Sequence, residues 1–123
     1  MGRWHDGRGR LWLDAGPGGA NPGAPLPLEI AASYRARTRG LLGRDGIEGA
    51  LLLTPASSVH TFRMRFAIDV AYLDRRLTVR AVHTMRPNRL GRPRLRSRHV
   101  LEAEAGAMAA WGLRPGTRLR IET

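Results

Sequence analysis

The chain has 123 residues, a length that suits one domain rather than two. Of these residues 42% are hydrophobic and 25% charged, a composition typical of a folded protein rather than of a disordered chain. Its formal net charge is +11, and all 21 basic residues are arginine. The absence of cysteine excludes a disulfide scaffold, a thiolate zinc site, an iron–sulfur cluster and a cysteine nucleophile. The absence of lysine excludes Schiff-base chemistry and a Walker A lysine.

The N-terminal part combines a short strand with a loop. Residues 10–14 favour a short edge strand. Eight of the twelve residues from Gly16 to Pro27 are glycine or proline, which indicates a surface loop. We therefore divide the chain into an N-terminal segment, 1–25, and a compact domain, 26–123. Because no stretch is long and apolar enough to be an export signal or a membrane span, we expect a cytoplasmic protein with no membrane partner.

The first half of the domain is predicted to alternate strand, helix and strand. Leu28–Ile30 alternates in hydropathy like a strand. Ser33 suits the N-cap of a helix predicted over Tyr34–Leu42, and Gly43 suits the position after its last turn. The aliphatic run Ala50–Leu53 predicts a buried strand.

The second half is dominated by strands. Hydrophobic patterning predicts them at His60–Met64, Ile68–Leu73, Leu77–Thr84, His99–Glu104 and Arg118–Glu122. The second and third of these favour an antiparallel hairpin. A short helix is predicted over Ala105–Trp111, with Gly112 as its end. Strands mixed with two short helices indicate the α+β class.

Four short motifs follow one another along the domain: RGLLGR at 39–44, GALL at 49–52, HTFRMRFAIDV at 60–70 and VLEAEAG at 100–106. In combination and order they resemble the DUF192 family over roughly residues 26–121. The resemblance implies a small α+β domain with a barrel-like sheet, in a family whose biochemical function is not established. We therefore expect a small, mostly antiparallel, barrel-like sheet with two short helices.

Polar residues inside the predicted strands are the candidates for a functional site. A buried carboxylate costs several kcal/mol unless it is paired, so Asp69 and Glu102 each need a partner. One interpretation is a polar cluster that only stabilises the fold. The other is a pocket in a non-enzymatic small-ligand-binding or accessory module, and a small enzyme with His60 as general acid/base is the alternative. The candidate pocket residues are His60, Met64, Asp69, Glu102, Arg39 and Arg44.

A soft-metal site is the competing interpretation of this region. His60 and Met64, together with His83 and Met85, are ligand types that suit Cu(I). Four residues along a strand span about 13 Å, which is too far for one ion unless the segment bends. Met64 is more simply a core residue. We therefore predict no metal and no cofactor.

Positive charge is concentrated between Arg75 and Leu101, a stretch with nine arginines and no acid. The other 96 residues hold 12 arginines and 10 acids. Within the stretch, the predicted loop 86–98 favours binding to a polyanion or nucleic acid, without sequence specificity because the loop has no aromatic residue. A solvated loop in an arginine-rich chain is the other interpretation. The candidate residues are Arg86, Arg89, Arg92, Arg94, Arg96 and Arg98. No feature of the sequence indicates an oligomeric state.

Overall fold

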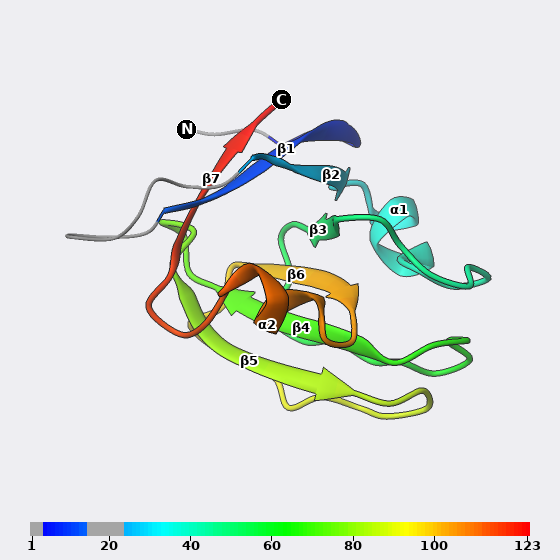
Figure 1. The fold of residues 1–123 in the computed structure, drawn as a ribbon. Helices are drawn as coiled ribbons and strands as arrows, with labels where there is room; N and C mark the ends of the chain where they lie inside the picture. Colours follow the sequence, from blue (N-terminus) through cyan, green and yellow to red (C-terminus); the bar gives the residue numbers. More distant parts are fainter. Residues whose placement is uncertain (1–3, 15–23) are drawn as a thin grey trace.

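The computed structural model describes residues 4–14 and 24–123, which form one curved sheet with two short helices (Figure 1). The seven strands are β1 (Gly7–Asp14), β2 (Leu26–Ala31), β3 (Ala50–Leu53), β4 (Ile68–Leu73), β5 (Val79–Met85), β6 (His99–Glu104) and β7 (Arg118–Glu122). The helices are α1 (Tyr34–Arg39) and α2 (Ala107–Trp111). No helix in the described ranges has the length and apolar character needed to cross a membrane.

The sheet has the strand order β5-β4-β6-β3-β2-β1-β7. Neighbouring strands are antiparallel except β2 and β3, which are parallel and connected through α1. A parallel pair needs such a crossover, because a tight hairpin joins only antiparallel strands. The α+β class, the mostly antiparallel sheet and the two short helices are thus confirmed.

The two outer strands, β5 and β7, meet at one end of the sheet and give it the form of a half-barrel (Figure 1). Thr78 and Arg118 form an isolated bridge there. The Leu119 amide donates to the Leu77 carbonyl over 2.9 Å, and the Val79 amide donates to the Thr117 carbonyl over 2.8 Å. The barrel-like character expected from the resemblance therefore arises from closure at this end.

The N-terminal strand differs from the prediction for residues 10–14. β1 begins at Gly7 and pairs with both β2 and β7, so it lies inside the sheet and is not an edge strand. Of the predicted glycine- and proline-rich loop, residues 16–23 lie outside the described part of the chain, and Leu26 and Pro27 belong to β2. Local composition underestimated these strands because their pairing partners lie far away in the sequence.

Helix α1 begins as predicted and ends earlier. The Ser33 Oγ accepts a hydrogen bond from the Ala36 amide over 3.0 Å, which is the expected N-cap. The predicted helix to Leu42 is wrong, because α1 ends at Arg39. Gly40 adopts a φ of 48° and its amide donates to the Ala36 carbonyl, so the first available glycine ends the helix, before Gly43.

The predicted strand His60–Met64 is also wrong. His60 forms a single bridge to Leu90, after which the chain turns. Arg63 has a φ of 61°, and the Met64 amide donates to the Thr61 carbonyl over 3.2 Å. The side chain of Asn88 accepts from the Arg63 amide, so a residue from another segment holds the turn in place. The period-two pattern therefore belongs to a folded loop.

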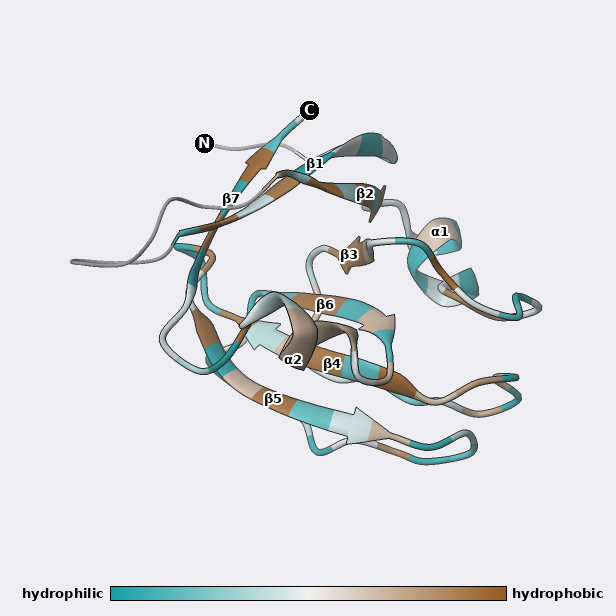
Figure 2. Ribbon diagram, in the orientation of Figure 1, coloured by the Kyte–Doolittle hydropathy of each residue, from teal (hydrophilic) through white to brown (hydrophobic). Residues whose placement is uncertain are grey.

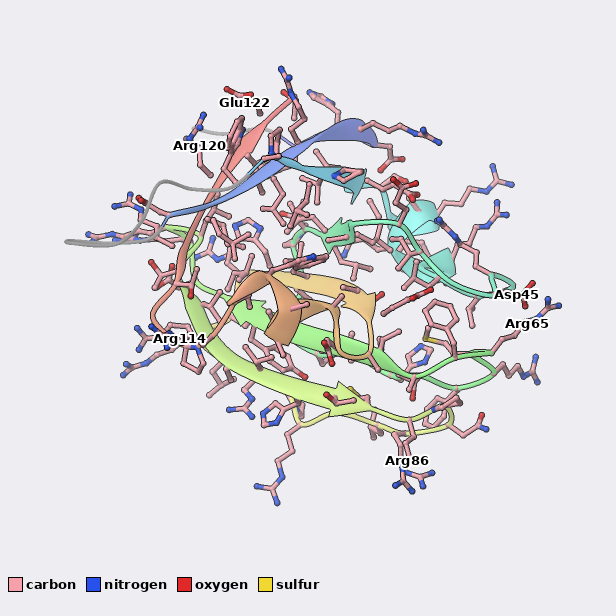
Figure 3. All side chains as sticks on the ribbon, viewed as in Figure 1. Asp45, Arg65, Arg86, Arg114, Arg120 and Glu122 are labelled. Atoms are coloured by element: carbon pink, nitrogen blue, oxygen red, sulfur yellow. The ribbon has the colours of Figure 1, made fainter. Side chains whose placement is uncertain are left out.

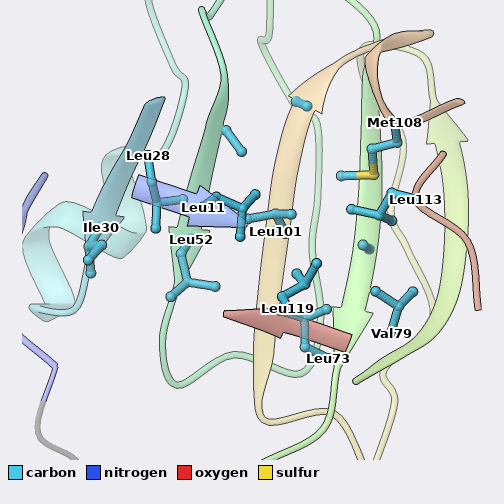
Figure 4. Close-up of a cluster of buried hydrophobic side chains, with 13 residues drawn as sticks. Leu11, Leu28, Ile30, Leu52, Leu73, Val79, Leu101, Met108, Leu113 and Leu119 are labelled. Carbon is cyan, nitrogen blue, oxygen red and sulfur yellow. The ribbon is translucent and has the colours of Figure 1, made fainter. Parts of the chain in front are cut away.

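Hydrophobic residues pack on both faces of the sheet. Side chains from all seven strands meet on the inner, concave face, where Met108 of α2 and Leu113 join them (Figure 4). On the outer face, Leu41, Ile47 and Met64 from the connecting loops cover β3, β4 and β6. Every residue of β3 is buried, and Figure 2 shows this strand as hydrophobic along its length. Successive strand residues therefore face different cores, and this decides which polar groups can meet.

Candidate functional site

Asp69 lies on the inner face of β4 and caps helix α2. Its Oδ2 accepts hydrogen bonds from the amides of Gly106 (2.9 Å) and Met108 (3.1 Å), and its Oδ1 accepts one from the Thr84 hydroxyl (2.7 Å). The helix has no capping side chain of its own, so Asp69 satisfies amides that would otherwise lack acceptors. This carboxylate is only 4% exposed and has a structural role.

Glu102 lies on the opposite, outer face of the sheet. It is opposite Val70 and Leu51 in the neighbouring strands, both of which belong to the outer core. Glu102 is 4% exposed, and burial raises the pKa of its carboxyl group to about 7. No residue in the described ranges forms an ion pair with it or hydrogen-bonds its carboxyl group. The two predicted acids therefore do not share a site.

A small cavity of about 80 Å³ lies between α1, the loop around His60 and the outer face of the sheet. We call it the Glu102 cavity, and its walls include Arg39, His60, Met64 and Glu102. Four of the six predicted pocket residues thus line one space. His60 and Met64 both reach it because the segment between them bends.

Arg44, a candidate pocket residue, pairs with an acid on β2 and does not line the Glu102 cavity. Its guanidinium group forms two hydrogen bonds of 2.9 Å to the two carboxylate oxygens of Glu29 on β2. These bonds and the nearby charge hold the pKa of Glu29 below its usual value and raise that of Arg44. A second ion pair, Arg65 to Asp45 at 3.1 Å, joins the tips of the two loops beyond α1 (Figure 3). Neither pair involves Asp69 or Glu102.

His60 is exposed at the edge of the Glu102 cavity. Its ring stacks on that of Phe62 with centroids 5.0 Å apart, and its Nδ1 accepts a long hydrogen bond of 3.4 Å from the Phe62 amide. Within the described ranges no carboxylate lies within ion-pair distance of the imidazole. His60 therefore lacks the carboxylate that orients a catalytic imidazole.

The arginines of the loop 86–98 divide between two places. Arg86, Arg89, Arg92 and Arg94 line an open groove of about 560 Å³ at the end of β5, which we call the arginine groove. The Arg86 side chain projects outward at this end of β5 (Figure 3). Arg96 and Arg98 line a separate hollow together with the acid Asp74. The other residues that line this hollow are Arg75, Arg76 and Leu95.

Tyr72 and His83 line the arginine groove but are missing from the candidates derived from the sequence. Arg94 stacks over the Tyr72 ring with its guanidinium carbon 5.1 Å from the ring centroid. Its Nη2 donates to the His83 Nε2 over 2.6 Å, since a guanidinium group only donates. The sequence offered one signal, because Tyr72 brings a polar hydroxyl into an otherwise aliphatic run from Val70 to Leu73.

Neither cavity contains an evident metal site. Across residues 4–14 and 24–123, no three His, Asp or Glu side chains lie close enough together to hold a metal ion. The two histidines and two methionines considered as copper ligands also divide between the cavities. His60 and Met64 line the Glu102 cavity, whereas His83 and Met85 line the arginine groove.

Known proteins resemble this chain in sequence and in fold. The model of the DUF192 family, described as "Uncharacterized ACR, COG1430", matches residues 19–121. UPF0127 protein PH1112 of Pyrococcus horikoshii is 31% identical over 84 residues, covering 64% of this chain and 73% of the relative. UPF0127 protein PYRAB11210 of Pyrococcus abyssi is also 31% identical over 84 residues, covering 64% of this chain and 72% of the relative.

Two crystal structures share the fold. One, called a "putative transcription regulator (R01717)", comes from Sinorhizobium meliloti 1021 and has a TM-score of 0.74, 21% identity and 98% coverage of both chains. The other, a protein of unknown function from Novosphingobium aromaticivorans DSM 12444, has a TM-score of 0.75 and 17% identity, covering 90% of this chain and 83% of that one. Because the family model matches residues 19–121 and the UPF0127 relatives match in sequence, the chain belongs to the DUF192 (UPF0127) family.

Proposed function

We propose that this protein is a non-enzymatic binding module that takes a small polar ligand, or the polar end of a larger one, into the Glu102 cavity. The observation that carries the proposal is the Glu102 carboxyl group, which is almost fully buried and has no hydrogen-bond donor in the described part of the chain. A buried polar group without a partner is costly, whereas a ligand that supplies a donor removes that cost. Glu102 is therefore the group that the ligand would contact.

The charges around the cavity limit the chemistry of the ligand. A negatively charged ligand would meet the Glu102 carboxylate, and a positively charged one would meet Arg37 and Arg39, which also line the cavity. A neutral hydroxyl or amide group avoids both repulsions. It also suits both states of Glu102, because a carboxyl group near its pKa of about 7 accepts a hydrogen bond when ionised and donates one when protonated.

The surroundings of His60 favour binding over catalysis. An acid/base histidine is usually oriented by a carboxylate, and His60 is instead exposed and stacked on Phe62. The cavity holds only a few water-sized groups, which leaves little room for both a substrate and a reacting water. A binding role requires neither.

The test is to titrate small-molecule fragments into the protein and to monitor binding through the NMR chemical shifts of the backbone amides. Neutral fragments that carry a hydroxyl or amide group should shift the amide signals of Leu41, Leu53 and His60, which surround the cavity. Glu102→Leu should abolish these shifts. Glu48→Gln, which removes an exposed carboxylate elsewhere, should leave them unchanged. The proposal fails if no such fragment shifts these amides or if Glu102→Leu binds the fragments as well as the wild type.

A further inference from the structure

We propose that the arginine groove is a second, independent binding site, for a small phosphorylated molecule with an apolar part. The groove is formed by the end of β5 and the loop that follows it, with Tyr72 of β4 at its floor. It lies on the outer face of the sheet, as the Glu102 cavity does. The amide of Gly91, which lines the groove, donates over 2.8 Å to the carbonyl of Val59, which lines the cavity, so these two loops meet between the two spaces.

The floor of the groove presents a hydrogen-bond donor without a partner. Tyr72 is only 2% exposed, and no residue in the described ranges hydrogen-bonds its hydroxyl group. Burial raises the pKa of this hydroxyl, an effect that Arg94 opposes and Glu102 reinforces. The phenol therefore keeps its proton at neutral pH and is a donor. A phosphate oxygen at the floor would supply the missing acceptor.

Guanidinium groups surround this donor without a protein counter-ion. None of Arg86, Arg89, Arg92 and Arg94 forms an ion pair within the described ranges, and no acid lines the groove. Arg94 is held by the Tyr72 ring and by His83, so its orientation is fixed before a ligand binds. Its Nε–H is buried and unpaired there. Several arginines around one space suit the oxygens of a phosphate group, which accept bidentate hydrogen bonds.

A hydrogen-bond network fixes the shape of the loop that carries these arginines. The Thr61 side chain is fully buried, and its Oγ1 donates to the Arg86 carbonyl (2.5 Å) and accepts from the Arg89 amide (2.8 Å). The Thr61 amide donates to the Arg89 carbonyl over 2.8 Å, and the Thr61 carbonyl accepts from the Asn88 amide over 2.7 Å. The backbone of Arg86 and Arg89 is thus fixed by hydrogen bonds to Thr61.

The dimensions and the lining favour a small molecule over a nucleic acid. A volume of about 560 Å³ lies within the range of small-ligand sites. Met85 and Leu90, the latter 72% exposed, provide apolar surface beside the arginines. Arg96 and Arg98 line a different hollow, which contains Asp74, so the loop does not direct its six arginines along one track. A polymer would need such a track.

The experiment measures the binding of phenyl phosphate and of inorganic phosphate by calorimetry at low and physiological salt. Phenyl phosphate should bind more tightly than inorganic phosphate. Tyr72→Phe removes one oxygen and should weaken phenyl phosphate binding roughly tenfold, and so should Arg89→Gln, since each loses a hydrogen bond to a charged group. Arg96→Gln removes the same charge from the same loop but lies outside the groove, and should change the affinity by less than about twofold.

Several outcomes would overturn the proposal. Equal weakening in Arg89→Gln and Arg96→Gln would show general attraction of anions to a basic surface. A ten-residue oligothymidylate that binds at physiological salt, and depends equally on all six loop arginines, would show a nucleic-acid surface instead. Failure to bind phenyl phosphate would also refute it. Because Arg89 is exposed, its variant should keep the wild-type unfolding midpoint, and Tyr72→Phe should fold because only an unpaired hydroxyl is removed.

Discussion

Replacement of Glu102 by glutamine should make the protein more stable above neutral pH. In the unfolded chain the carboxyl group ionises near its ordinary value of 4.5, whereas burial raises its pKa in the folded protein to about 7. Between these two values the folded state binds more protons than the unfolded state. Stability therefore falls as the pH rises from 4.5 to above 7, because an ionised carboxylate is then enclosed without a partner.

The size of the effect follows from the two pKa values. A difference of one pKa unit corresponds to about 1.4 kcal/mol, so the full shift corresponds to a loss of about 3 kcal/mol at high pH. At pH 5 most of this loss is absent, because Glu102 is still protonated in the folded protein. The stability of Glu102→Gln relative to wild type should therefore increase by between about 2 and 3 kcal/mol from pH 5 to pH 8.

Urea denaturation of both proteins at pH 5, 6, 7 and 8 measures this difference directly. The paired design cancels the contributions of all groups that the two proteins share. Glu48→Gln makes the same change of charge at an exposed site and should follow the wild type at every pH. If Glu102→Gln and wild type show the same pH dependence, the carboxyl group is already paired in solution, and the reasoning about both its burial and its ligand is wrong.

Three other predictions concern residues outside the two cavities. Asp69→Ala should lower the free energy of unfolding, measured by urea denaturation, by about 2 to 3 kcal/mol, because the amides of Gly106 and Met108 lose their acceptor. Asp69→Asn keeps an acceptor oxygen and should lower it by clearly less, so equal losses in the two variants would contradict the capping role. A double-mutant cycle on Glu29 and Arg44 should give a coupling energy of about 0.5 to 1 kcal/mol that weakens with salt, because the pair is partly exposed. The coupling should also weaken as the pH falls below 4.5, where Glu29 becomes protonated, and a coupling that salt does not change would contradict this prediction. Gly49→Ala should lower the free energy of unfolding by at least about 2 kcal/mol, because Gly49 has a φ of 72° and a methyl group there would overlap the Pro27 carbonyl. An unfolding midpoint equal to that of the wild type would refute this close approach of the two backbone segments.

The elements that could be predicted from the sequence are those whose structure depends on residues close by in the chain. The Ser33 N-cap, the hairpin of β4 and β5 and the buried strand Ala50–Leu53 follow from capping, turn spacing and hydropathy, and all three are present. Two of the failed predictions depend on partners that are distant in the sequence. β1 became an interior strand because β7, from the other end of the chain, pairs with it. The His60–Met64 segment became a turn because the side chain of Asn88 accepts a hydrogen bond within it.

Only part of the lining of the two spaces could be anticipated from the sequence, because Arg39, His60, Met64 and Glu102 line the Glu102 cavity whereas Asp69 and Arg44 do not. Asp69 and Glu102 are both buried acids on adjacent strands, and only the register, which places Asp69 opposite Ala103, assigns them to different faces of the sheet. A shift of the register by one residue would reverse this assignment. The position of Tyr72 beneath the loop arginines also depends on the path of a loop with two prolines and one glycine, which sequence patterns do not determine.

The partial closure of the half-barrel leaves two strand edges that are only briefly paired. β5 and β7 share backbone hydrogen bonds at one end, and among the described residues no other strand pairs with their outer edges. The rest of each edge therefore offers backbone amides and carbonyls to an extended chain that approaches it. Arg80 on β5 and Arg118 on β7 are exposed at the end where the two strands meet. Two copies approaching edge to edge would bring these cations together, which opposes intermolecular sheet extension. We therefore expect repulsion between these arginines to disfavour the association of two copies through this seam.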